Sequence, residues 1–357
     1  MQHLIDLDDY PVSWWNRVIA LGKDIYTNPG RYKGACAGKV MCTLFYEPST
    51  RTQMSFQTAM LRLGGSLIGF DNPATSSVSK GENLKDTTKI VSGYSDVLVI
   101  RHPLEGAAKA AALTAECPVI NAGDGGHLHP TQTLTDMLTL TMEKGRTDNL
   151  VIGMCGDLLN GRTVHSLCKA LSCYPNNKFI FISTPELMVP QYVKDILDSH
   201  GCEYREVSSL EETIPELDVL YMTRIQSERF ASKEEYESQK NVYVLDRKKL
   251  NLGKKDLIVL HPLPRVDEIT MDVDDDSRAL YFKQTKYGMY VRMALVLTLI
   301  ENRDKDGAQL LKGSVLRDAK CTNPRCITHP EYYLPKSFIK SGDIAECEYC
   351  DERILLS

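Results

Sequence analysis

Residues 45–52 (FYEPSTRT) gather side chains that could bind a phosphate group. An apolar run over residues 39–46 predicts a buried strand, and residues 52–63 have helical character. A helix that begins here would present free backbone N–H groups and the positive end of its dipole. Hydroxyl donors and a forked cation come from Ser49, Thr50, Arg51 and Thr52. The alternative interpretation is an ordinary capped helix start, where hydroxyl residues are common.

Four of the eleven cysteines lie near the C-terminus: Cys321, Cys326, Cys347 and Cys350. Two close pairs separated by about twenty residues are typical of a structural Zn²⁺ site with four thiolates. The alternative is four free surface thiols. His329 is a further candidate ligand, although four cysteines already complete a tetrahedral shell. Residues 313–357 are too few to fold on an apolar core alone, so we expect the metal to supply folding free energy.

The elements that position these residues follow from the pattern of apolar segments. Buried strands are predicted over residues 96–100, 150–155, 178–182, 219–222 and 257–260. Helices are predicted over residues 107–115, 131–144, 163–171, 189–200 and 289–303. Strands separated by helices indicate parallel α/β sheets, and the pattern restarts near residue 148.

The predicted fold class is therefore α/β, with two doubly wound parallel-sheet domains and a small C-terminal four-Cys zinc domain. A length of 357 residues fits two or three domains. We expect one domain over residues 1–145 with the returning helix 289–303, and a second over 146–288. The zinc domain is expected over 313–357, after a boundary near 304–313.

Composition excludes several classes of function. Lys and Arg total 42 and Asp and Glu total 47, and this net charge of −5 disfavours a nucleic-acid partner. The longest apolar stretch, residues 293–300, is much shorter than the ~20 residues of a membrane span. The acidic N-terminus lacks the features of a signal peptide, and an odd number of cysteines disfavours a disulfide framework. We expect a cytoplasmic protein with no nucleic-acid or membrane partner.

Six ordered motifs resemble the carbamoyltransferase family, and within it the aspartate carbamoyltransferase catalytic chains. After Ser49–Thr52 these are residues 101–103 (RHP), 129–132 (HPTQ), 161–165 (GRTVH), 221–226 (YMTRIQ) and 261–265 (HPLPR). They extend over residues 1 to about 305. The resemblance implies transfer of the carbamoyl group from carbamoyl phosphate to L-aspartate in pyrimidine synthesis, with no cofactor for catalysis.

The resemblance also implies how carbamoyl phosphate is bound. The phosphate is held by Ser49, Thr50, Arg51, Thr52 and Arg101, with Ser76 and Lys80 from the loop 75–82. The carbonyl oxygen accepts from Thr52, Arg101 and His129, whereas the residues alone do not separate His129 from His127. The carbamoyl –NH₂ is held by Gln132 and by the backbone carbonyls of Pro262 and Leu263. The implied catalytic set is Arg51, Thr52, Lys80, Arg101 and His129.

The aspartate site implied by the resemblance consists of Lys80, Arg162, Arg224, Gln226 and Leu263. The two arginines would face the two carboxylates of the substrate.

Read alone, residues 75–82 form a flexible polar loop. In the family this loop reaches a neighbouring subunit's active site through residues equivalent to Ser76 and Lys80, although Ser77 and Ser79 are close. We therefore expect a homo-oligomer, a trimer or a dimer of trimers, with active sites shared between chains.

Two other functions are considered. Ornithine carbamoyltransferases have Cys in place of Pro262, and the pair Arg224 and Gln226 suits a second carboxylate better than an ammonium group. A non-catalytic scaffold subunit is the other alternative. It is disfavoured by the intact set of phosphate-loop residues with Arg101, His129 and Gln132.

The tail resembles the zinc domain of the aspartate carbamoyltransferase regulatory chain, here joined to a catalytic chain. The effector-binding domain that precedes it in that family has no counterpart, so we expect no strong response to nucleotides. We interpret the tail as a docking module that joins trimers or braces one trimer. A nucleic-acid-binding zinc ribbon is the alternative, but the tail lacks a basic surface charge.

Overall fold

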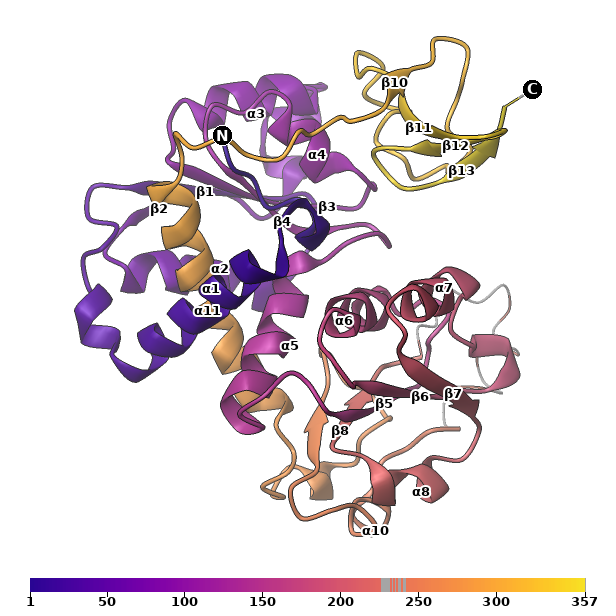
Figure 1. Ribbon diagram of the computed structural model, residues 1–357. Coiled ribbons are helices and arrows are strands. Elements are labelled where there is room, and N and C mark those ends of the chain that lie inside the picture. Colours follow the sequence, from indigo (N-terminus) through magenta and orange to yellow (C-terminus); the bar gives the residue numbers. More distant parts are fainter. Residues whose placement is uncertain (226–231, 233, 235, 237–238, 240–241, 357) are drawn as a thin grey trace. The chain divides into compact units, whose positions relative to one another are not determined.

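The computed structural model describes residues 1–225, 232, 234, 236, 239 and 242–356 (Figure 1). The chain divides into two compact units: Met1–Thr131 with Met289–Ser357, and Gln132–Gly288. Two helices run across the division, α5 (Pro130–Glu143) and α11 (Tyr281–Glu301). Gln226, a predicted aspartate contact, lies outside the described residues.

The first unit contains a parallel sheet in the order β2-β1-β3-β4. Its strands are β1 (Val40–Phe45), β2 (Ser66–Phe70), β3 (Val97–His102) and β4 (Val119–Asp124). Its helices are α1 (Val12–Thr27), α2 (Thr50–Arg62), α3 (Leu84–Ser92) and α4 (Ala107–Ala112). The register pairs Phe45 with Arg101, and His102 with Asp124. The loops that follow β1, β3 and β4 therefore leave the same edge of the sheet, where open α/β folds bind ligands.

The second unit contains a parallel sheet in the order β7-β6-β5-β8-β9. Its strands are β5 (Val151–Cys155), β6 (Lys178–Ile182), β7 (Glu203–Val207), β8 (Val219–Met222) and β9 (Ile258–Leu260). Its helices are α6 (Arg162–Ser172), α7 (Gln191–Ser199), α8 (Leu210–Thr213) and α10 (Arg247–Leu250). Cys155 pairs with Met222, and Tyr221 pairs with Leu260. The carboxyl ends of β5, β8 and β9 are consequently neighbours.

The predicted architecture of two parallel α/β sheets is confirmed, with local differences. Strands β2, β4 and β7 were not predicted. β2 and β7 are sheet edges without a buried residue, and β4 has only a short apolar start before Asn121 and Gly123. The helix predicted over residues 289–303 begins earlier, at Tyr281. No helix in the described part of the chain, α11 included, is long and apolar enough to cross a membrane.

The C-terminal tail folds as an antiparallel sheet and belongs to the first unit (Figure 1). Its strands are β10 (Ser314–Val315), β11 (Ser337–Ser341), β12 (Ile344–Cys347) and β13 (Arg353–Leu355). Phe338 and Tyr349 of the tail share one apolar cluster with the alanines of α4. The core of the tail is therefore continuous with the core under the first parallel sheet.

Candidate active site and metal centre

The predicted phosphate loop lies between β1 and α2. Ser49 occupies the N-cap position of α2, but its side chain makes no capping hydrogen bond to that helix. Its hydroxyl is therefore not used as an ordinary helix start would use it. Arg51 is exposed and Thr52 is buried in the first turn. The free N–H groups of this turn, with these side chains, form a cradle suited to a dianion.

Arg101 lies at the end of β3, directly beside this loop. Its side chain is 12% exposed, with Nη2 2.8 Å from Glu47 Oε2 and Nη1 donating to Ala122 O at 3.2 Å. The buried Nε has no hydrogen-bond acceptor within the described residues, so its N–H is available to a ligand. Partial desolvation of the otherwise exposed Arg51 side chain lowers its pKa, and the nearby positive charge of Arg101 lowers it further. A guanidinium group whose charge is disfavoured by a neighbouring cation favours the binding of an anion.

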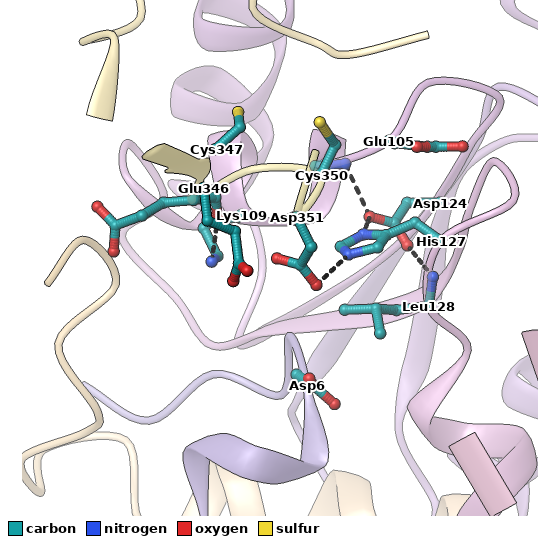
Figure 2. A network of polar contacts seen from close by, with 12 residues as sticks. Asp6, Glu105, Lys109, Asp124, His127, Leu128, Glu346, Cys347, Cys350 and Asp351 are labelled. Atoms are coloured by element: carbon teal, nitrogen blue, oxygen red, sulfur yellow. Dashed lines mark hydrogen bonds and ion pairs between the residues drawn. The ribbon is translucent and has the colours of Figure 1, made fainter. Parts of the chain in front are cut away.

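The structure distinguishes the two histidines of the loop after β4. His127 is held on both ring nitrogens, with Nδ1 3.1 Å from Asp124 Oδ2 and Nε2 2.9 Å from Asp351 Oδ2 (Figure 2). Burial lowers the pKa of His127, but the two carboxylates outweigh it and raise the pKa well above its usual value. His129 is buried at the start of α5, and its Nδ1 lies 3.4 Å from Thr131 Oγ1. Both ring nitrogens of His127 are thus held by carboxylates, and the assignment of His129 to the carbonyl oxygen stays a prediction.

Two short 3₁₀ helices, Pro73–Thr75 and Ser77–Lys80, form the start of the loop 75–82 and the residues just before it. Ser76 caps the second of these, and its Oγ donates to Pro73 O at 2.8 Å. Lys80 is exposed. Within the described residues, no hydrogen bond or ion pair joins Ser76 or Lys80 to the phosphate loop of the same chain. The structure therefore does not bring this pair together with the other predicted phosphate ligands.

In the second unit, Gln132 is tied to a buried carboxylate one turn further along α5. Its Nε2 donates to Asp136 Oδ1 at 2.8 Å, and Gln284 Nε2 donates to the same oxygen at 2.6 Å. Tyr221 OH donates to Asp136 Oδ2 at 3.0 Å. Burial and the adjacent Asp136 raise the pKa of Tyr221 well above its usual value, so the phenol remains a donor. Asp136 thus fixes the side chain predicted to hold the carbamoyl amide.

Hydrogen bonds also fix the segment that follows β9. His261 N donates to Gln284 Oε1 at 3.0 Å, and His261 Nδ1 accepts from Leu263 N at 2.7 Å. His261 Nε2 therefore carries the proton and donates to Glu268 Oε1 at 2.7 Å. Burial raises the pKa of Glu268, but the hydrogen bond from His261 and the other lowering contributions outweigh it, so the pKa falls.

Leu263 has an unusual backbone conformation in this segment. Its φ of 55° lies in the left-handed region, which bulky residues avoid, and the Leu263–Pro264 bond is cis. Leu263 N is held by His261, as described above. The two backbone carbonyls assigned to the carbamoyl amide, those of Pro262 and Leu263, therefore lie in a segment of defined geometry.

The two arginines predicted to bind aspartate lie at one edge of the second sheet. Arg162 is the first residue of α6, which follows β5, and Arg224 follows β8. These strands are paired, and Thr223 N donates to Cys155 O at 2.8 Å. Both arginines are half-buried. The carboxyl ends of β5 and β8 therefore supply two guanidinium groups on the same side of the sheet.

The four C-terminal cysteines converge as their spacing predicts. Their Sγ atoms all lie within 4.8 Å of one another, and all four residues are buried. Cys321 Sγ lies 3.5 Å from Cys350 Sγ, and Cys326 Sγ lies 3.8 Å from Cys347 Sγ. Tetrahedral Zn²⁺ with Zn–S bonds of about 2.3 Å would separate its sulfurs by about 3.8 Å. The donor set therefore fits Zn²⁺, and His329 instead has its Nε2 2.9 Å from Asn323 O.

Sequence reasoning missed the residues that hold the predicted ligands in place. Glu47 lies inside the phosphate-loop segment, and its acidic side chain beside Ser49 was the available signal. Asp136 could have been found from its i+4 spacing to Gln132 on a helix. Glu268 and Gln284 carry no local signal, because only the folded chain brings them to His261.

Comparison with protein-family models identifies three matching segments. Residues 2–142 match the carbamoyl-P binding domain of aspartate/ornithine carbamoyltransferase, and residues 148–299 match its Asp/Orn binding domain. Residues 316–355 match the metal binding domain of the aspartate carbamoyltransferase regulatory chain. The prediction of a catalytic chain joined to a regulatory-chain zinc domain is thereby confirmed.

Individual relatives agree with the family models. The aspartate carbamoyltransferase catalytic subunit of Clostridium novyi (strain NT) is 58% identical over 299 residues, which are 84% of this chain and 98% of that protein. The catalytic subunit of M. jannaschii aspartate transcarbamoylase has a TM-score of 0.80 and 45% identity, covering 86% of this chain and all of the other. Aspartate transcarbamoylase from Trypanosoma cruzi, solved with N-(phosphonacetyl)-L-aspartic acid, has a TM-score of 0.78 and 37% identity, covering 84% and 95%. This chain therefore belongs to the aspartate carbamoyltransferase family of enzymes.

Proposed function

We propose that this chain transfers the carbamoyl group of carbamoyl phosphate to the amino group of L-aspartate, as one step of pyrimidine synthesis in the cytoplasm. The amine nitrogen attacks the carbonyl carbon, a C–N bond forms and the C–O bond to phosphate breaks. The nitrogen loses one proton, and the products are N-carbamoyl-L-aspartate and phosphate. The names of its relatives support aspartate rather than ornithine as the acceptor.

In this proposal, the positively charged groups of the carbamoyl phosphate site belong to the first unit. Residues 1–145 with 289–303 form the carbamoyl phosphate domain. Ser49, Thr50, Arg51, Thr52 and Arg101 bind the phosphate dianion. Thr52, Arg101 and His129 donate to the carbonyl oxygen as it gains negative charge, and preorganised donors of this kind lower the barrier to acyl transfer. Gln132 and the carbonyls of Pro262 and Leu263 bind the carbamoyl –NH₂.

The aspartate domain in this proposal is residues 146–288. Arg162 and Arg224 pair with the two carboxylates, because a guanidinium group matches a carboxylate with two parallel hydrogen bonds. Gln226 and Leu263 add polar contacts. Ser76 and Lys80 act in the active site of a neighbouring copy, so the enzyme is a homo-oligomer built from trimers. This assignment agrees with the exposure of Lys80 in the single chain.

The metal in this proposal is structural. Cys321, Cys326, Cys347 and Cys350 bind Zn²⁺ as four thiolates in the zinc domain, residues 313–357. Four protein ligands complete the shell, so no position is open for substrate. Bound Zn²⁺ supplies folding free energy to a short segment, and the transfer reaction itself uses only side chains and backbone of the rest of the chain.

The observation that carries this proposal is the buried Arg101 Nε with no acceptor within the described residues, beside a helix start whose N-cap hydroxyl is not used for capping. The test is carbamoyl transfer by the purified chain, with aspartate and ornithine compared side by side. We expect activity with aspartate only. Arg101→Gln should lower kcat/KM by at least 10²-fold, which is typical for loss of one such donor.

Arg62→Gln is the matched control, because Arg62 is an exposed arginine in the last turn of α2. Its activity should stay within about twofold of the parent chain. Activity with ornithine would contradict the assigned acceptor. An equal loss in both variants would show that Arg101 acts through general surface charge. No activity with either amine would favour the scaffold function.

A further inference from the structure

The zinc tail contacts the loop that leads to His129. This loop, residues 124–128, leaves the carboxyl end of β4 and contains Gly125 and Gly126. Glycine-rich backbone loses more conformational entropy on ordering than other backbone. A loop of this kind needs outside contacts to hold one geometry. Figure 2 shows the side chains of the body and of the tail that meet at this position.

The first contact is the chain Asp351–His127–Asp124. Asp351 directly follows the predicted zinc ligand Cys350, and its Oδ2 lies 2.9 Å from His127 Nε2. The opposite ring nitrogen lies 3.1 Å from Asp124, whose other oxygen accepts from Leu128 N at 3.0 Å. Leu128 immediately precedes His129. A continuous path of hydrogen bonds therefore runs from the metal-binding turn to the residue next to His129.

A second contact reaches the same loop through Glu105. Its backbone exchanges two hydrogen bonds with the tail, with Glu105 N donating to Arg325 O and Ile327 N donating to Glu105 O, both at 2.9 Å. Its side chain joins the two parts, because Oε2 accepts from Asn323 Nδ2 at 2.6 Å and Oε1 accepts from Gly126 N at 3.3 Å. This path is independent of His127.

Close packing at Gly106 holds the tail against these two paths. Gly106 has a φ of +83°, and a Cβ there would meet Tyr349 Cβ at 2.5 Å and Tyr349 O at 2.6 Å. Gly106 N donates to Asp124 Oδ2 at 2.8 Å. Lys109, on α4, donates to the backbone carbonyl of Glu348. The tail is thus seated on the same residues that anchor the loop.

We propose that the zinc tail positions the loop 124–128. Asp351 and His127 are the positioning residues, and they hold His129 in place through Asp124 and Leu128. The proposal rests on the function proposed above. Neither residue touches substrate. Zinc fixes the turn at Cys350, the turn presents Asp351 to His127, and the loop 124–128 is held in one conformation. The tail therefore supports catalysis within its own chain, in addition to any role in assembly.

The test uses variants on both sides of the contact, Asp351→Asn and His127→Asn, in the full-length zinc-loaded chain. Hydrogen exchange of residues 124–129 should quicken in each, while bound zinc per chain and exchange in β5–β9 stay unchanged. We expect kcat/KM for carbamoyl phosphate to fall about tenfold, since small misplacements of catalytic groups are costly. The double variant should be no worse than either single variant, because both break one path.

Glu346→Gln is the matched control. Glu346 is a tail carboxylate that pairs with Arg353 at 2.8 Å, and this pair lies within the tail itself. It should leave loop exchange and kcat/KM unchanged. Gly106→Ala tests the same idea, because the added Cβ would clash with Tyr349 and push the tail away from the body. We expect faster hydrogen exchange of residues 124–129 in this variant as well. If Asp351→Asn also releases zinc, His127→Asn alone decides the question, since it changes nothing in the tail.

Unchanged loop exchange and unchanged kinetics in Asp351→Asn and His127→Asn would overturn the proposal, provided that the parent chain is active. Additive losses in the double variant would overturn it too, because they would show two unrelated effects. A parent chain without carbamoyl transfer would instead refute the proposed function. In that case the exchange measurement still reports whether the tail holds the loop.

Discussion

In the second unit, the carboxylate that joins the segments predicted to contact substrate is Asp136, which is fully buried in that unit. In the first unit, one of the organising carboxylates is Asp351, whose side chain is 56% exposed and which belongs to the C-terminal tail. Both units are parallel α/β sheets with loops at their carboxyl edges. They differ in whether the support for those loops comes from their own core or from a segment added at the end of the chain.

This difference has a physical consequence for each unit. Hydrogen bonds to a buried carboxylate act in a low dielectric, and breaking one leaves polar groups without partners. The network of Asp136, Gln132, Gln284 and His261 should therefore persist as long as the second unit is folded. The Asp351–His127 contact depends instead on a turn that a metal ion holds. The first unit should be sensitive to metal, and the second should be sensitive to core substitutions.

Removal of zinc should give the largest effect and should act on the first unit alone. With a chelator we expect residues 313–357 to lose their fold, because structural zinc contributes on the order of 10 kcal/mol or more to such segments. Limited proteolysis followed by mass spectrometry should show early cleavage in the tail, while residues 146–288 remain resistant.

Cys173→Ser is the control for this experiment, because Cys173 lies outside the four-cysteine cluster. Its pattern of cleavage with and without zinc should match that of the parent chain. Equal protection of the tail before and after chelation would contradict a folding role for the metal. If both units were cleaved at the same rate after chelation, they would not differ in their dependence on the metal.

Asp136→Asn should give an intermediate effect, confined to the second unit. An amide offers one acceptor oxygen, whereas both carboxylate oxygens of Asp136 accept hydrogen bonds in the folded chain. At least one donor must then face the new NH₂ group, at a cost of about 1–3 kcal/mol. Urea unfolding should measure this loss of stability. We also expect kcat/KM for carbamoyl phosphate to fall about tenfold, because Gln132 would no longer be held in place by Asp136.

Asp195→Asn is the matched control on α7, where an exposed carboxylate accepts one bond from Gln191 at 2.8 Å. We expect a change within about 0.5 kcal/mol there. If the two variants lost equal stability, burial of Asp136 would not be the source of its importance. If Asp136→Asn released zinc, the two units would not be independent.

The smallest effect concerns acid stability in the second unit. Arg278 donates to Asp276 through Nε and Nη2, both at 2.9 Å, and these bonds lower the pKa of Asp276 to about 2. A pKa below the unfolded value of about 4 stabilises the fold above that pH, and the gain is lost as pH falls towards 2. Asp276→Asn should therefore cost about 1 kcal/mol at pH 7 and less at pH 3.

Chemical unfolding at pH 7, 4 and 3 would measure this dependence. Asp275→Asn is the control, since Asp275 is an exposed neighbour in the same segment. For Asp275→Asn, the difference in unfolding free energy from the parent chain should not shrink as the pH falls. If Asp276→Asn lowered the unfolding free energy by the same amount at all three pH values, the charge of Asp276 would not contribute to stability.

Much of the fold was predictable because the central strands are continuous apolar runs. The residues of β3 and β5, for example, are buried on both faces of their sheets and carry few polar side chains. The edge strands β2 and β7 contain no buried residue, so their sequences carry no comparable signal. The clustering of the four cysteines was predictable because their residue type and paired spacing are those of a metal site.

The sequence by itself was enough to predict which residues bind phosphate, a dicarboxylate and a metal, because residue type, short spacing and ordered family motifs carry that information. Only the tertiary structure decided how those residues are supported. His127 and Asp351 are separated by 224 positions and Asp136 and Gln284 by 148, and no local pattern links them. The structure also placed the tail in the first unit's core. Such contacts depend on how distant elements pack, and packing is a property of the folded chain as a whole.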